Sequence, residues 1–237
     1  MNTQLSYIFT VLLTCSVTVL IYQGFARVQV KLNRVWLNPM LLTVLVLIAC
    51  LSILNIDYAA YKKASSPLNT LLELAVVTLG FPLYQYLQSM KTKWQAISVL
   101  LVFAALVAIV SSFILTWLFI SQHDVAISLS LKSITTPIAL AITEQFKGNA
   151  AVTAFTIILA GLFGAIWGVK WLTFIGVTSV NAQGLAIGTA SHALGTATVS
   201  QLSYQHAAYS SLALILSATI TAIVAPVVLP FLLINFG

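Results

Sequence analysis

The sequence predicts an all-α polytopic membrane protein with about seven or eight spanning or half-spanning helices, some of them broken. Three observations predict this class. Hydrophobic residues make up 60% of the 237 residues, and charged residues make up only 6%, whereas a soluble domain carries roughly 25%. The apolar residues also fall into runs close to the roughly 20 residues that cross a bilayer. Because these runs fill the chain, we expect a single integral membrane domain over residues 1–237, surrounded by lipid.

The spans are predicted from the apolar runs and from the polar connections between them. We interpret the first run as a retained helix and not as a signal peptide, because no basic residue precedes it and no cleavage pattern follows it. The fourth run is longer than a bilayer requires, so it tilts or extends past the interface. In chain order the predicted spans are residues 5–22, 39–56, 68–86, 94–120, 152–174 and 209–233, with broken segments at 132–146 and 184–197.

The basic residues predict the orientation of the chain. If the N-terminus is outside, the connections that carry Arg27, Lys31, Arg34, Lys91 and Lys93 are cytoplasmic, and Lys62 and Lys63 are on the other side. Cytoplasmic connections carry the excess of Lys and Arg, so we expect the N-terminus outside. Residues 23–36 are expected at the lipid headgroups. The basic residues are scattered over several connections, which argues against a nucleic-acid surface despite the net charge of +6.

The first broken segment contains a helix start inside apolar sequence. Thr136 is suited to the N-cap and Pro137 to the first helical position. The helix N-terminus would attract an anion, and Lys132, Ser133 and Thr135 just upstream would add a cation and hydroxyl donors. The segment is therefore a candidate carboxylate site. A proline-kinked helix with Lys132 reaching the interface is an equally open interpretation.

The second broken segment combines glycines with polar side chains. Glycine permits close helix approach or local unwinding, and polar groups inside a membrane line a cavity or bond to neighbouring helices. Both interpretations stay open, and we favour a polar site in which the histidine bonds substrate or carries a proton. The residues concerned are Gly184, Gly188, Thr189, Ser191, His192, Gly195 and Thr196.

No enzyme, metal or cofactor is predicted. Ser191 and His192 are adjacent, so on a helix their side chains diverge, and no orienting acid is evident for a hydrolase. No spacing of His, Cys, Asp or Glu suggests metal ligands. We expect His123 and His206 to be solvated in polar connections, and we expect Gly161, Gly164 and Gly168 to form a helix-packing surface.

Two carboxylates are candidates for proton coupling. Glu144 follows Pro137 by two helical turns and so shares its face; its alternatives are an ion pair with Lys147 or a place at the interface. Glu73 lies inside the third apolar run. It is either a proton-binding acid in a pore or a residue near an interface. Residues 71–81 and 134–144 are both short, partly polar segments ahead of a long span, which is compatible with the inverted repeat of many transporters.

These motifs resemble the LrgB/CidB family of bacterial membrane proteins, whose relatives include the C-terminal half of the plastid glycolate/glycerate transporter. The resemblance covers nearly the whole chain. Two motifs are specific to the resemblance: residues 131–139, LKSITTPIA, and residues 184–197, GLAIGTASHALGTA. Residues 82–84 and 212–226 add weaker support. The chain departs from the family at Leu131, where proline is usual, and at Glu73-Leu74, where Gly-Pro is usual.

The resemblance implies a multi-pass protein of the bacterial cytoplasmic (inner) membrane, a homodimer, and a small LrgA/CidA-type membrane partner. It also implies two functions. One is transport of small monocarboxylates such as glycolate, glycerate or pyruvate, by an elevator-like or rocking motion. The other is holin-associated control of murein hydrolase activity and cell lysis. The candidate anion site favours transport, because a nonspecific hole needs no such site. A membrane scaffold that moves no solute is the third alternative.

Overall fold

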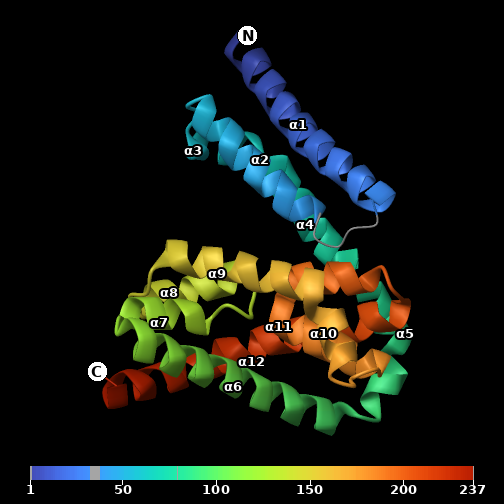
Figure 1. Cartoon of the computed structure of the whole chain (residues 1–237), viewed down its shortest axis with the longest axis vertical. Coiled ribbons are helices and arrows are strands. Elements are labelled where there is room, and N and C mark those ends of the chain that lie inside the picture. The colour runs from blue at the N-terminus through green and yellow to red at the C-terminus, as the bar shows by residue number, and fades with distance from the viewer. Residues whose placement is uncertain (1, 33–37, 79, 237) are drawn as a thin grey trace. The chain divides into compact units, whose positions relative to one another are not determined.

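The computed structural model describes residues 2–32, 38–78 and 80–236, and every regular element among them is a helix (Figure 1). The predicted all-α class is therefore confirmed. The chain divides into two compact units, residues 1–78 and 79–237. The single domain predicted for residues 1–237 stays a prediction, because a membrane domain can contain more than one compact unit.

The described residues of the first unit, 2–32 and 38–78, form four helices: α1 (Asn2–Leu32), α2 (Pro39–Ile53), α3 (Tyr58–Ala64) and α4 (Ser66–Thr78). α2 begins at Pro39 because the side chain of Asn38 accepts hydrogen bonds from the backbone N–H groups of Met40 and Leu41, at 2.9 and 3.2 Å. Thr18 of α1 and Tyr61 of α3 share a hydrogen bond of 3.1 Å. α1 continues ten residues past the predicted end of the first span at residue 22, so the basic residues before Leu32 lie on this helix.

The second unit holds the remaining elements. α6 coincides with the predicted fourth span, whereas the predicted third span, 68–86, is divided between α4 and α5. The elements are α5 (Gly80–Lys91), α6 (Trp94–Ile120), α7 (His123–Ser130), α8 (Thr136–Gln145), α9 (Ala150–Phe163), the π-helical turn η1 (Gly164–Gly168), α10 (Val169–Phe174), α11 (Val180–Ser200) and α12 (Tyr204–Phe236).

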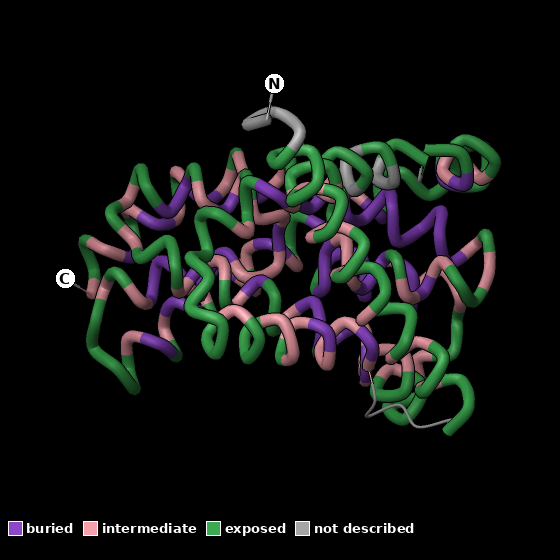
Figure 2. The backbone as a smooth tube through the Cα atoms, turned by 90° about the horizontal axis from the view of Figure 1, so that it is seen from above, coloured by how far each residue is buried: buried purple, intermediate pink, exposed green. Residues whose placement is uncertain are grey.

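The core of the second unit forms around α12, which packs against α5, α6, α8 and α11. One apolar cluster joins α6, α7, α8, α9 and α12, with Phe113 and Leu229 fully buried. A second joins α5, α6 and α12, with Leu101 and Tyr209 at its centre. Buried and exposed positions alternate along the helices in Figure 2, as expected where each helix buries one face.

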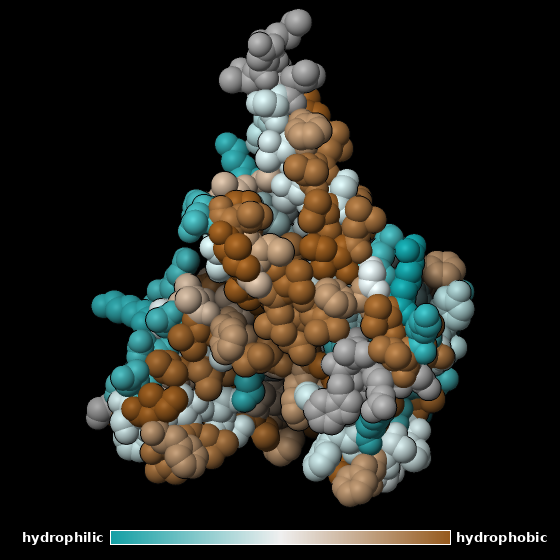
Figure 3. Space-filling model, turned by 45° about the horizontal axis from the view of Figure 1, so that its top comes forward, coloured by the Kyte–Doolittle hydropathy of each residue, from teal (hydrophilic) through white to brown (hydrophobic). Residues whose placement is uncertain are grey.

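The exposed faces of the long helices are apolar, which soluble proteins avoid. Phe103, Phe155, Ile223 and Val227 are all more than 60% exposed, and brown apolar residues cover much of the visible surface in Figure 3. Among the described residues, four helices are long and apolar enough to cross a membrane: 6–32, 94–120, 150–174 and 204–236. The chain is thus a multi-pass membrane protein.

Candidate functional site

The first helix break lies between α7 and α8. α7 ends at Ser130, residues 131–134 form a turn and bend, and α8 begins at Thr136. The residue before α8 is Thr135, with φ −69° and ψ 143°, and its side chain makes no capping hydrogen bond. The predicted cap at Thr136 is therefore one residue late, and its hydroxyl contact is absent. An N-cap side chain bonds the N–H of the second or third helical residue, and Pro137, the second, has none.

The second helix break lies within α11, at His192 and not at a glycine. His192 has φ 41° and ψ −138°, a conformation that costs L residues about 1–3 kcal/mol. The glycines of α11 instead allow close packing against α12. A Cβ on Gly188 would strike the carbonyl oxygen of Ser210, and one on Gly184 would meet the Cβ of Tyr209 at 2.9 Å. Of the two predicted roles for these glycines, close helix approach is confirmed, and the unwinding lies at His192 instead.

His192 connects the break in α11 to α9. Its side chain is buried, and its Nε2 lies 2.8 Å from the carbonyl oxygen of Ile157. A carbonyl oxygen only accepts, so Nε2 carries the proton and donates. The ring also lies against Gly161, where a Cβ would meet Cε1 at 2.7 Å. His192 thus holds two helices together at the break.

The π-helical turn η1 lies directly beside the break. A Cβ on Gly164 would strike the Oγ of Ser191, and a Cβ on Gly168 would strike the side chain of Ile187. Together with Gly161, these glycines form a packing surface for α11, as predicted. π-Turns inside α-helices are frequent at functional sites, and this one makes room for Ser191.

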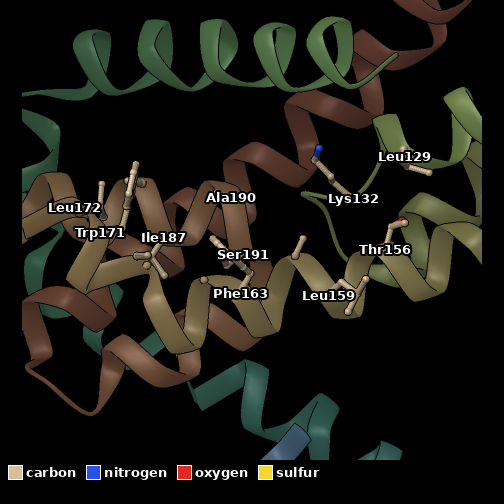
Figure 4. Close-up of a pocket in the computed structure, with 14 residues that line it drawn as sticks. Leu129, Lys132, Thr156, Leu159, Phe163, Trp171, Leu172, Ile187, Ala190 and Ser191 are labelled. Carbon is tan, nitrogen blue, oxygen red and sulfur yellow. The ribbon is translucent and has the colours of Figure 1, made fainter. Parts of the chain in front are cut away.

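A cavity of about 530 Å³ lies where the two breaks meet (Figure 4). Lys132 enters it from the α7–α8 connection, Ser191 from α11, and Leu159 and Phe163 from α9. Among the described residues, Lys132 is the one charged side chain in its lining. The full lining is Leu129, Lys132, Thr156, Leu159, Ala160, Phe163, Gly164, Gly168, Trp171, Leu172, Ala186, Ile187, Ala190 and Ser191.

A second cavity, of about 510 Å³, shares part of this wall and includes Ser133 and Thr189. Four residues line both cavities: Lys132, Leu172, Ala186 and Ala190. Within the described part of the chain, the Lys132 amine has neither a carboxylate nor a hydrogen-bond partner. An unpaired cation in apolar surroundings is unfavourable, so Lys132 is available to bind an anion from either cavity.

The structure brings four of the predicted site residues together around these cavities: Lys132, Ser133, Thr189 and Ser191. The hydroxyl of Thr189 donates to the carbonyl of Leu185 at 2.7 Å, so it can only accept from a ligand. Seven others lie outside both linings: Thr135, Thr136 and Pro137 at the start of α8, and Gly188, His192, Gly195 and Thr196 in the packing of α11.

The polar side chains of α11 were expected either to line a cavity or to bond to neighbouring helices, and each interpretation holds for different residues. Ser191 and Thr189 line cavities, whereas Thr196 is fully buried and lies 3.5 Å from the carbonyl oxygen of Ser210. Glu144 is exposed in the last turn of α8 and does not line either cavity. Glu73 belongs to α4, but its side chain lies outside the described residues.

Sequence reasoning missed a buried polar network at the start of α12. His206 is buried, and its Nε2 lies 3.1 Å from Oε1 of Gln183. Its Nδ1 lies 2.9 Å from the hydroxyl of Ser203. The prediction of a solvated His206 is wrong because α12 begins five residues earlier than residue 209. His123 is likewise half-buried, with a buried Nδ1.

Fold and site together define a multi-pass helical membrane protein in which two broken helices meet at cavities that share one lysine. The sequence model of the LrgB-like family matches residues 18–231, and the chain belongs to that family. It is 34% identical to the holin-like protein CidB of Staphylococcus aureus, over 92% of this chain and 95% of that one. No solved structure gives a significant match.

Two further relatives extend over most of the chain. The holin-like protein CidB of Staphylococcus epidermidis is 31% identical over 97% of this chain and 98% of its own length. An uncharacterized protein of Haemophilus influenzae is 39% identical over 84% of this chain and 85% of its own length. These relatives are bacterial proteins.

Proposed function

We propose that this protein carries small monocarboxylates, of the glycolate, glycerate or pyruvate type, across the bacterial cytoplasmic membrane. The observation that supports this most directly is that Lys132 lines two adjoining cavities and that its amine has no partner among the described residues. A cation without a partner is costly in an apolar cavity, and a bound carboxylate would offset that cost with a charge-assisted hydrogen bond.

The surrounding groups fit an oxyanion. Ser191 offers a hydroxyl in one cavity and Ser133 in the other, and each can donate a hydrogen bond to a carboxylate oxygen. The walls are otherwise apolar, which strengthens the attraction between the amine and the carboxylate. Because Lys132 borders both cavities, a carboxylate can stay bound to it while access changes from one cavity to the other.

The proposal includes a small LrgA/CidA-type membrane partner and a homodimer, as the family resemblance implies. Uptake of radiolabelled glycolate, glycerate and pyruvate into proteoliposomes tests it, with and without the partner. We expect uptake above that of protein-free vesicles in at least the vesicles that contain both proteins. Uptake at the level of empty vesicles in every arm would refute the proposal.

A second candidate function is holin-associated control of murein hydrolase activity and cell lysis. It is favoured by the name of the staphylococcal relatives, holin-like protein CidB. This function needs no anion site, so Lys132→Ala would leave the lysis phenotype intact and leakage would be indifferent to the charge of the solute. Loss of lysis control with Lys132→Ala alone would instead connect it to anion binding.

A further inference from the structure

The two ends of α11 lie close together. At its start, Oδ1 of Asn181 accepts a hydrogen bond of 2.6 Å from Nε2 of Gln205, the second residue of α12. At its end, a short turn joins Ser200 to Tyr204, the first residue of α12. A straight helix of 21 residues would hold these ends about 30 Å apart. The chain therefore reverses its direction within α11.

The reversal takes place at His192, where φ is 41° and ψ is −138°. Gly188 lies before this residue and Thr196 lies after it, yet both meet the same carbonyl of α12. A Cβ on Gly188 would strike the carbonyl oxygen of Ser210, and Oγ1 of Thr196 lies 3.5 Å from that oxygen. One straight helix would separate residues 188 and 196 by about 12 Å along its axis. α11 is therefore a hairpin with one arm on each side of His192 and its tip at this residue.

The hairpin enters the protein from the end where α6 begins. α12 runs in the same direction as α6 (Figure 1), because Tyr209 near its start packs with Leu101 in the first half of α6. At the other end of both helices, the rings of Phe236 and Trp117 have centroids 5.2 Å apart. Since both ends of α11 lie at the start of α12, they lie at the end of the unit where α6 begins.

The α7–α8 break enters from the opposite end. α7 follows the end of α6 directly, since only residues 121–122 separate the two helices. The connection after α8 returns to α7, where the backbone N–H of Asn149 donates to the hydroxyl of Ser128 at 2.8 Å. α6 is long enough to cross a bilayer, so the two broken segments enter from opposite faces. They meet at the cavity that Lys132 and Ser191 line (Figure 4).

The tip of α11 is held inside the protein. The first arm, residues 180–191, is about 18 Å long, enough to reach the middle of a hydrocarbon core of roughly 30 Å. At this depth non-helical backbone needs contacts with protein or with a cavity. His192 provides one, because its Nε2 donates to the carbonyl oxygen of Ile157 at 2.8 Å. This hydrogen bond fastens the tip to α9, next to Ser191 in the cavity wall.

We infer that α11 is a re-entrant lid over the anion site, which enters the membrane from the face where α6 begins and which His192 fastens to α9. His192 is a positioning residue, since it lies outside both cavity linings and acts through its neighbour Ser191. Release of its hydrogen bond frees the tip, and the site then opens toward that face. The inference rests on the proposed function for the anion, whereas the course of the hairpin rests on the contacts alone.

The accessibility of single cysteines in a cysteine-free background tests the course of α11. Ser179 and Leu202 flank the helix, and both are exposed. In intact cells and inverted vesicles, an impermeant maleimide should label Ser179→Cys and Leu202→Cys from one face, the face from which it labels Lys93→Cys at the start of α6. Labelling of Ser179→Cys and Leu202→Cys from opposite faces would overturn the inference, because α11 would then cross the membrane. So would labelling of both from the face of Gln122→Cys.

The rate at which Ser191→Cys reacts with methanethiosulfonate ethylsulfonate tests the fastening, on the full chain in phosphatidylcholine nanodiscs. The Ser191 side chain is 3% exposed with the tip in place, so the cysteine should react slowly. We expect His192→Ala to raise this rate at least about fivefold, because loss of a buried hydrogen bond shifts an equilibrium by roughly that factor. His192→Gln keeps an N–H donor of similar reach and should restore the slow rate.

Thr143→Cys is the control for unfolding, since Thr143 on α8 is fully buried away from the lid. Its rate should stay unchanged in the His192→Ala background. If that rate rises, His192→Ala has unfolded, and His192→Gly, which loses the same hydrogen bond without the strain, takes its place. An unchanged rate at Ser191→Cys, or a His192→Gln variant as fast as His192→Ala, would overturn the fastening.

These outcomes are separable from that of the proposed function, because neither measurement needs transport. Labelling and rates as expected, without uptake of any carboxylate, would refute transport and leave the lid intact. Uptake of glycolate or pyruvate together with labelling of Ser179→Cys and Leu202→Cys from opposite faces would refute the lid alone.

Discussion

Lys132 illustrates a conflict between stability and function at a single residue. Lys132 lines two largely apolar cavities, and its amine has no partner among the described residues. Folding therefore leaves a half-buried cation beside apolar walls with no compensating contact, which is unfavourable for the folded protein. Such a residue persists where a ligand supplies the missing charge, in agreement with the general observation that ionisable groups inside membranes are functional.

Replacing Lys132 by methionine should separate these two effects. We expect Lys132→Met to raise the thermal unfolding temperature in detergent, since an apolar chain of similar length suits the cavities. Carboxylate uptake should fall at least tenfold, the equivalent of losing a charged hydrogen bond of about 1.5–3 kcal/mol.

Lys170→Met is the matched control, because Lys170 is exposed on α10. Lys170→Met should change neither the unfolding temperature nor carboxylate uptake strongly. A lower unfolding temperature for Lys132→Met would mean that Lys132 has a structural partner after all.

His192 has a backbone conformation that glycine adopts more readily. Its φ of 41° and ψ of −138° strain any L residue, so His192→Ala loses the hydrogen bond to Ile157 and keeps the strain. His192→Gly loses the same bond but relieves the strain. We expect the glycine variant to be more stable than the alanine variant by roughly 1–3 kcal/mol, measured by unfolding in detergent. An alanine variant of equal or greater stability would contradict the strained backbone.

For single residues, the sequence predicts which side chains are unusual better than it predicts their contacts. Lys132 and Ser191 could be singled out because a polar group in apolar sequence is costly wherever it lies. The partner of each group could not be predicted. His192 bonds a carbonyl on α9 and Thr196 lies near one on α12, and both partners depend on how distant helices pack.

Among the elements, η1 is the one that shapes the site most directly. Its first residue, Gly164, lies against Ser191, and its last residue, Gly168, lies against Ile187. Because a π-turn adds a residue to the helix, it changes which side chains face α11 on either side of the turn. Here the two facing positions are glycines, so α11 can approach closely and Ser191 can fit.

Gly164→Ala should disrupt this arrangement. The added Cβ would strike Ser191 Oγ, and overpacking of this kind costs about 1–3 kcal/mol. We expect a lower unfolding temperature, and partial recovery in the double variant Gly164→Ala/Ser191→Gly, which removes the obstructing side chain.

Gly24→Ala is the matched control, because nothing lies within 4 Å of a Cβ added at Gly24. Alanine in a helix interior is favoured by about 1 kcal/mol over glycine, so this variant should be unchanged or more stable. Full stability of Gly164→Ala would show that α11 does not pack against η1.

The two helix breaks differ in how visible they are in the sequence. Pro137 marks the start of α8 to within one residue, because the lack of an N–H acts locally. The break at His192 has no such local signal, and the glycines around it proved to be packing positions.

For the molecule as a whole, composition alone predicts the class. A chain with 6% charged residues and four long apolar helices in its described part belongs in a membrane. Composition does not reveal that residues 1–78 and 79–237 form separate compact units. That division depends on which helices pack together, and the hydrophobic pattern of a membrane helix, apolar on several faces, carries little of this information.

The orientation in the membrane is the prediction that belongs to the whole molecule. α6 is the clearest reference, since its 27 residues cross a bilayer without interruption. Lys91 and Lys93 precede it, whereas Ser121 and Gln122 follow it. The positive-inside rule therefore places its beginning in the cytoplasm, and an N-terminus outside then requires an odd number of crossings before α6.

Single cysteines in a background without Cys15 and Cys50 test this orientation. We expect a membrane-impermeant maleimide to label Gln122→Cys and Asn2→Cys in intact cells, and to label Lys93→Cys only after the membrane is permeabilised. Labelling of Lys93→Cys from outside would invert the whole protein. Labelling of Gln122→Cys but not Asn2→Cys would keep α6 as predicted, would require an even number of crossings before it, and would contradict the outside N-terminus.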